Sequence, residues 1–176
     1  MLNRGFSGYQ TEWALPVFEQ VGIMKSTGTI NNRSAQIFAM QYEQSHVPQV
    51  ELLTIWFGAN DAVPPPNPQH VPRDEYMQNL EHMVDMVKSP SSPYHSPDTR
   101  IILITPPPVN PYQTSIRDFN MTKSYAEAAK EVGSALQIPV ADVWTKIWEA
   151  SGENEKALAT YLTDGLHLTV AGYQVR

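Results

Sequence analysis

The sequence contains no cysteine among its 176 residues. This absence excludes a disulfide scaffold, a cysteine-ligated metal and a thiol nucleophile. No hydrophobic run approaches the roughly 20 residues that span a bilayer, and the first five residues lack the apolar core of a signal peptide. Lysine and arginine form no cluster, and the formal net charge is -6, so neither a nucleic-acid partner nor an anionic membrane is expected. These absences together favour a cytoplasmic protein.

What the chain does contain is the composition of one globular domain. Hydrophobic residues make up 41% of the sequence and charged residues 17%, which is far from the signature of disorder. Its length fits the usual size of a single domain. We therefore expect one domain that spans residues 1–176.

Three short apolar runs have the length and composition of buried strands. They are Val50–Phe57, Arg100–Thr105 and Ile138–Val143. Helical patterns lie between them, from about Arg73 to Lys88 and over Ser124–Leu136. Strands that alternate with helices of this length predict an α/β fold with a parallel sheet and helices on its faces.

Two helices carry specific expectations about which side chains are buried. Within Arg73–Lys88, apolar residues recur at spacings of three and four and predict one buried stripe, made of Tyr76, Leu80, Met83, Val84 and Val87. An earlier helix is expected over Thr11–Val21, with Trp13, Val17 and Phe18 facing inward.

Two features have an ordinary structural interpretation and a functional alternative. The proline stretches Pro64–Pro68 and Pro106–Pro108 follow strand ends and favour stiff extended loops over an SH3-type ligand. The four tryptophans, which are Trp13, Trp56, Trp144 and Trp148, are expected in the core more than in a substrate pocket.

Ligands of open parallel sheets bind beyond the carboxyl ends of the strands, and three polar stretches are expected there. The first, Asn3–Tyr9, carries Gly5 and Gly8 in a short loop before a helix. It is interpreted either as a tight turn that needs positive φ or as a backbone N–H donor to an anion or oxyanion.

The second stretch, Gly58–Asp61, directly follows the first predicted strand. Asn and Asp form local turn hydrogen bonds, so an ordinary strand-exit turn is one interpretation. The amide of Asn60 at a strand's carboxyl end is also placed to donate to a developing oxyanion. The residues alone leave both interpretations open.

The third stretch is Asp164–His167. A carboxylate three residues before an imidazole, with Gly165 freeing the turn, can reach Nδ1–H and leave Nε2 as a general base. The alternative is a surface histidine beside a turn aspartate. A metal site is not expected, because the other histidines are scattered and no thiolate is present; they are His46, His70, His82 and His95.

In order and spacing, these three stretches resemble the motif blocks of SGNH (GDSL-type) hydrolases, most closely the isoamyl acetate-hydrolysing esterase branch. Asn3–Gly8 resembles the family's second block, Gly58–Asp61 the third and Asp164–His167 the fifth. The resemblance spans nearly the whole chain and implies a flavodoxin-like three-layer α/β/α fold with a parallel sheet. It also implies a small-molecule ester substrate and no cofactor.

The resemblance assigns a role to four residues. His167 resembles the base that takes the nucleophile's proton, and Asp164 the group that orients it. Gly8, through its backbone N–H, and Asn60, through its side-chain amide, resemble two of the three oxyanion donors. The family's third donor is the backbone N–H of the nucleophile itself.

The sequence departs from the family in the block that supplies this nucleophile. The family carries a Gly-Asp-Ser block after its first strand, and no such triplet occurs here. Ser7 neighbours Gly8 but lies in the wrong block. We therefore expect a domain that is incomplete at both ends and lacks its first strand, with a closing helix that starts at Val170 and ends early at Arg176.

These observations predict a carboxylic ester hydrolase that acts on small acetate-like esters by acyl-enzyme chemistry, with the chain itself inactive or nearly so. One alternative is a non-catalytic binding module that keeps the fold and the oxyanion pocket. Another is a carbohydrate acetylesterase of the same superfamily, since no residue identifies the acyl or alcohol pocket.

Overall fold

The computed structural model describes residues 7–21 and 50–175, and Gly5 of the first candidate stretch lies outside them. The elements follow one another as α1 (Thr11–Val21), β1 (Leu52–Trp56), α3 (Arg73–Lys88), β2 (Arg100–Ile104), α4 (Phe119–Leu136), β3 (Val140–Ala141), α5 (Val143–Ala150), η1 (Glu155–Thr160) and α6 (Val170–Tyr173).

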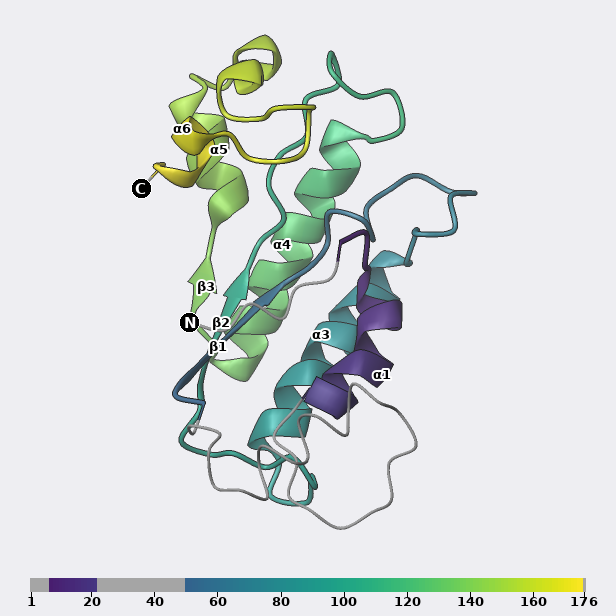
Figure 1. The fold of residues 1–176 in the computed structure, drawn as a ribbon, viewed down its shortest axis with the longest axis vertical. Helices are drawn as coiled ribbons and strands as arrows, with labels where there is room; N and C mark the ends of the chain where they lie inside the picture. The colour runs from purple at the N-terminus through teal and green to yellow at the C-terminus, as the bar shows by residue number, and fades with distance from the viewer. Residues whose placement is uncertain (1–6, 22–49, 176) are drawn as a thin grey trace.

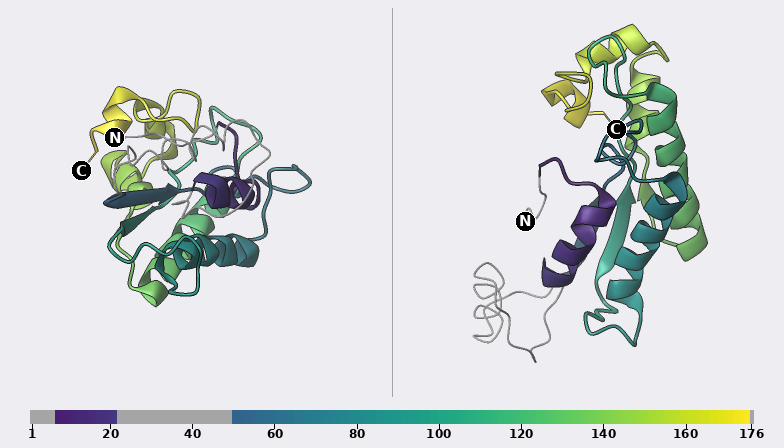
Figure 2. Two further views of the ribbon diagram at one scale, coloured as in Figure 1. Left: turned by 60° about the horizontal axis from the view of Figure 1, so that its bottom comes forward. Right: turned by 90° about the vertical axis from the view of Figure 1, so that its right-hand side faces the viewer.

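The strands form one parallel sheet in the order β1-β2-β3. Helix α3 connects β1 to β2 and helix α4 connects β2 to β3, and the two helices pack side by side (Figure 1). Figure 2 shows both helices on the same side of the strands, with α1 beside α3. The predicted α/β class and the parallel sheet are confirmed.

The main core lies between the sheet and helices α1, α3 and α4. All five predicted apolar positions of α3 are buried, so the periodicity identified its inward face. Tyr76 of α3 meets Tyr125 of α4 with ring centroids 5.1 Å apart. Burying an aromatic side chain of this kind contributes about 1.5–3 kcal/mol.

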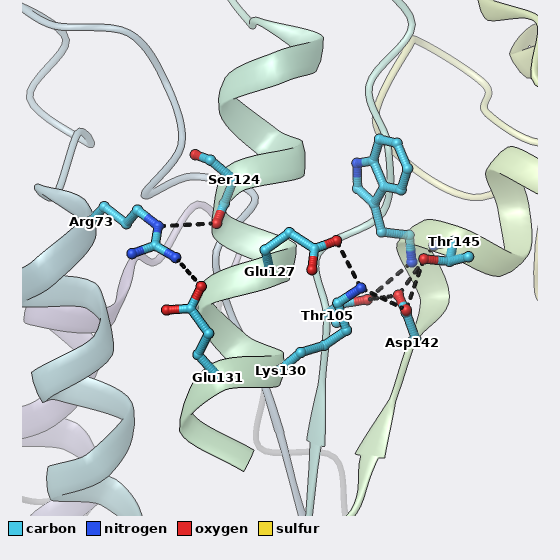
Figure 3. Close-up of polar contacts among 9 residues, drawn as sticks. Arg73, Thr105, Ser124, Glu127, Lys130, Glu131, Asp142 and Thr145 are labelled. Carbon is cyan, nitrogen blue, oxygen red and sulfur yellow. Dashed lines mark hydrogen bonds and ion pairs between the residues drawn. The ribbon is translucent and has the colours of Figure 1, made fainter. Parts of the chain in front are cut away.

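Ion pairs join α4 to its neighbours at the surface (Figure 3). Arg73 of α3 bonds Glu131 of α4 at 2.7 Å. Lys130 of α4 lies 2.7 Å from Glu127 on the same helix and 3.2 Å from Asp142, which follows β3. Exposed pairs of this type contribute at most about 1 kcal/mol each, so the apolar core carries most of the helix–sheet packing.

The prediction for the inward face of α1 is partly wrong. Trp13 is 43% exposed and packs edge-on against Tyr9, while Thr11 and Ala14 are buried. The polar bonds of Thr11 fix the rotation of the helix, because its hydroxyl donates to buried Asp61. The side chain of Phe18 lies outside the described set.

Two boundaries differ from the prediction because capping residues set them. Helix α4 starts five residues earlier than predicted, where the Asp118 carboxylate accepts from the N–H of Met121. The predicted third strand shortens to β3, because Asp142 caps α5 by accepting from the N–H of Thr145. An N-cap of this type stabilises a helix by about 1 kcal/mol.

The core prediction for the tryptophans holds for some of them and fails for others. Trp144 is buried at 3% exposure, as predicted for a core residue, and Trp148 is partly buried. Trp56 is 40% exposed on β1, so for Trp56 and Trp13 the core prediction is wrong. The buried stretch Pro106–Pro108 is not presented as an SH3-type ligand.

Candidate functional site

Asp164 and His167 form a hydrogen-bonded pair in the loop before α6. Gly165 adopts a φ of +88°, and a Cβ there would stand 3.0 Å from the carbonyl oxygen of Asn110. The turn therefore requires glycine. One carboxylate oxygen of Asp164 accepts from the N–H of Leu166 at 3.1 Å and of His167 at 2.9 Å, and the other lies 2.7 Å from Nδ1 of His167.

These bonds keep the carboxylate ionised. The backbone N–H and then the ring of His167 lower the pKa of Asp164 to about 2. An ionised carboxylate at Nδ1 holds the proton on that nitrogen and leaves Nε2 as the acceptor. The His167 side chain is 74% exposed, so its Nε2 is accessible, and its role as a base stays a prediction.

The stretch Gly58–Asp61 forms a tight turn at the carboxyl end of β1. Gly58 has a φ of +109°, and a Cβ would stand 2.8 Å from the Tyr76 hydroxyl. The N–H of Gly58 donates to the Asp61 carboxylate at 3.1 Å, and the N–H of Ala62 to the Gly58 carbonyl at 3.0 Å. The strand-exit turn is present, and it holds Asn60 at the rim of the sheet.

Asp61 is a buried hub of hydrogen bonds, which its place in the Gly58–Asp61 stretch does not predict. Its carboxylate accepts from the N–H of Thr11 at 2.8 Å and from the Thr11 hydroxyl at 2.5 Å, and Asn79 donates to that hydroxyl at 3.0 Å. Burial raises the pKa of Asp61. The hub ties the first turn of α1 to the turn that carries Asn60.

The Gly8 loop meets the Asn60 turn directly. Gly8 has a φ of +77°, in agreement with the tight-turn interpretation. Its carbonyl accepts from Nε2 of Gln69 at 2.8 Å, and the next carbonyl, of Tyr9, accepts from Nδ2 of Asn60 at 2.8 Å. The structure thus brings two of the four predicted residues together through Tyr9.

Arg117 and the loop before it connect the Asn60 turn with the Asp164–His167 loop. Arg117 donates from Nη2 to Oδ1 of Asn60 at 2.9 Å and from Nη1 to the carbonyl of Ala59. At the other end of the loop, the N–H of Asn110 donates to the Gly165 carbonyl at 2.9 Å. Burial lowers the pKa of Arg117, and the charge of Asp164 opposes that change. Arg117 lies outside the three motif stretches, so residue patterns alone do not mark it.

A hollow of about 310 Å³ lies near this region, at the ends of β1 and β3. Leu168 lines it with Trp56, Ile147 and Tyr173. Gly8, Asn60, Asp164 and His167 do not line it, so the geometry does not assign the substrate to it. Among residues 7–21 and 50–175, no group of three His, Asp or Glu side chains is arranged to hold a metal. None of the helices in these two ranges combines the length and the hydrophobicity that a membrane span requires.

Comparisons with known proteins cover nearly the whole chain. The model of the GDSL-like Lipase/Acylhydrolase family matches residues 1–175. A GDSL esterase/lipase of Arabidopsis thaliana is 34% identical over 99% of the chain and 68% of its own length. The isoamyl acetate-hydrolyzing esterase 1 homolog of Rattus norvegicus is 33% identical over 98% of the chain, which spans 63% of that relative.

Solved structures show the same fold. The lipase/acylhydrolase from Enterococcus faecalis has a TM-score of 0.61 and 26% identity, over 95% of this chain and 66% of that one. An acetyl-xylooligosaccharide esterase from Geobacillus superposes with a TM-score of 0.65 at 21% identity, over 99% of this chain and 67% of that one. The second likeness concerns the fold alone.

Proposed function

This chain belongs to the GDSL-like lipase/acylhydrolase family, and we propose that the complete protein hydrolyses small carboxylic esters such as acetates. The observation that carries the proposal is the Asp164–His167 pair, 2.7 Å apart, on a loop joined through residues 110–117 to the Asn60 turn. The name of the rat relative, an isoamyl acetate-hydrolyzing esterase homolog, supports an acetate-type substrate.

In the proposed mechanism, a serine hydroxyl attacks the ester carbonyl and gives its proton to Nε2 of His167. Asp164 stabilises the imidazolium that results. The oxyanion receives hydrogen bonds from the backbone N–H of Gly8 and the amide of Asn60, and one such donor contributes about 3 kcal/mol. His167 then protonates the leaving alcohol, and water hydrolyses the acyl-enzyme by the same steps.

The nucleophile is the part of this proposal that the 176 residues do not supply, because they contain no Gly-Asp-Ser triplet. We assign no such role to Ser7, which lies in the Gly8 loop. The proposal therefore places the serine in residues of the native protein beyond this sequence. The chain alone is expected to turn over esters slowly or not at all.

The test begins with the transcript upstream of Met1. We expect an in-frame sequence there that encodes Gly-Asp-Ser. The longer protein should hydrolyse p-nitrophenyl acetate, and His167→Ala should lower kcat by about 10³-fold or more. The 176-residue chain serves as the comparison. Turnover by this short chain that disappears in His167→Ala would show that a nucleophile within it has been overlooked.

The missing triplet also favours a second candidate, a binding module that retains the fold without the reaction. A genuine start codon at Met1, preceded by an in-frame stop, together with no turnover, would favour the module over the enzyme. The module would still be expected to bind small esters, which titration of the Asn60 amide resonances with ethyl acetate would detect.

A further inference from the structure

We infer that Arg117 is a positioning residue that fixes the orientation of the Asn60 carboxamide, so that its N–H groups face the Gly8 loop. This inference rests on the proposed function, in which Asn60 donates to the oxyanion. It assigns a task to a side chain that the motif blocks do not include.

The orientation follows from the donors and acceptors on either side of Asn60. A guanidinium carries only donors, so the group that faces Arg117 at 2.9 Å must be the carboxamide oxygen. A backbone carbonyl only accepts, so the group that faces Tyr9 at 2.8 Å must be the amide nitrogen. A flipped carboxamide would place its NH₂ group against the Arg117 guanidinium and its oxygen against the Tyr9 carbonyl. Neither pair can form a hydrogen bond, so both neighbours select the same orientation.

One amide hydrogen is used by Tyr9, and the second is the one assigned to the oxyanion. The hydrogen bonds within the turn do not select the carboxamide orientation. They join the Gly58 N–H to the Asp61 carboxylate and the backbones of Gly58 to Ala62 and of Asn60 to Val63, and none uses the Asn60 side chain. Tyr9 alone would leave the oxygen of Asn60 without a charged partner. A hydrogen bond to a charged donor is stronger than one between neutral groups, so Arg117 supplies the stronger of the two restraints.

Arg117 is also held in place from several sides. Its second donor binds the carbonyl of Ala59, in the same turn. The residue that follows it, Asp118, caps α4 by accepting from Met121 at 2.6 Å. The side chain is partly buried, and Asp164 attracts its charge. A side chain anchored in this way can restrain its neighbour at little further cost in rotamer entropy.

The decisive measurement is made on the ¹⁵N-labelled 176-residue chain. The side-chain NH₂ resonances of Asn60 are identified by their loss in Asn60→Asp. In Arg117→Met, the two resonances should move toward those of a free amide and their hydrogen exchange should accelerate about tenfold, in line with the loss of roughly 1.4 kcal/mol. Arg117→Lys, which keeps one charged donor, should give an intermediate result.

Arg73→Met is the matched control. Arg73 of α3 also donates to two acceptors, the Ser124 carbonyl and the Glu131 carboxylate of α4 (Figure 3). None of its hydrogen bonds reaches Asn60. It should lower the melting temperature without changing the Asn60 resonances. Unchanged Asn60 resonances in folded Arg117→Met or Arg117→Lys would overturn the inference.

A kinetic experiment on the longer, active protein separates this inference from the proposed function. Arg117→Met should lower kcat with little change in KM, and the effect should largely vanish in an Asn60→Ala background. Additive losses would overturn the positioning role. If the longer protein shows no turnover at all, the proposed function fails, and the amide resonances alone decide whether Arg117 orients Asn60.

Discussion

The Asp164 carboxylate accepts three hydrogen bonds from its two neighbours, Leu166 and His167. Because these bonds favour the ionised form, the pKa of Asp164 falls to about 2. A depressed folded-state pKa stabilises the folded state above the ordinary value of 3.8, and this contribution is lost as the pH falls toward 2. A ¹³C titration of the Asp164 carboxyl should show a midpoint near 2.

The matched variant for this titration is His167→Ala. It removes the ring but keeps the backbone N–H of residue 167, which is the larger cause of the shift. The midpoint should therefore rise and still remain below the ordinary value. A wild-type midpoint at the ordinary value would contradict the hydrogen-bonded turn.

For individual residues, the sequence predicts contacts between side chains that lie within a few positions of each other along the chain. The spacing of Asp164 and His167 predicts their contact, because a three-residue turn with glycine allows it. The bond between Arg117 and Asn60 spans 57 residues, and no local pattern encodes it. The catalytic roles of Gly8 and Asn60 come from family resemblance and remain predictions.

Among the secondary-structure elements, the contact of α4 with β3 depends on one missing side chain. A Cβ on Gly133 would lie 2.2 Å from Cγ2 of Val140 and 3.0 Å from the carbonyl of Ile138. Gly133→Ala gains up to about 1 kcal/mol of helix propensity, but overpacking costs about 1–3 kcal/mol. We expect a net loss of about 1 kcal/mol in the free energy of unfolding, measured by urea denaturation.

Val140→Ala provides the second side of a double-mutant cycle. It removes the methyl group that the new Cβ would strike, so Gly133→Ala should cost less in that background or become stabilising. Equal costs in both backgrounds would show that the close approach is not what excludes a side chain at Gly133.

Periodicity and capping account for what could be predicted about these elements. The regular apolar spacing of α3 predicted its residues and its buried face. The starts of α4 and α5 depend on single capping residues, Asp118 and Asp142, which the apolar pattern does not mark. The outward position of Trp13 follows from the tertiary bonds of Thr11, which hydrophobicity alone could not predict.

Across the described parts of the molecule, two clusters of unequal size hold most of the buried apolar side chains. The larger joins the sheet to α1, α3 and α4. The smaller is formed by Ile147, Leu158 and Leu162 with partly buried neighbours, among them Leu168. Leu168 is the residue after His167, so the loop that carries the proposed base packs on the smaller cluster.

A smaller cluster should open at lower free energy than the main core. Native-state hydrogen exchange is therefore expected to be faster for the N–H groups of Leu162 and Thr169, which bond to Leu158 and Tyr161, than for those of β2.

Leu158→Ala removes a fully buried side chain, at a cost of about 2–5 kcal/mol. It should accelerate exchange in the smaller cluster and change exchange in β2 much less, whereas Leu80→Ala in the main core should accelerate both. Equal acceleration by the two variants everywhere would mean that the clusters unfold as one cooperative unit, and the His167 loop would then be as stable as the sheet.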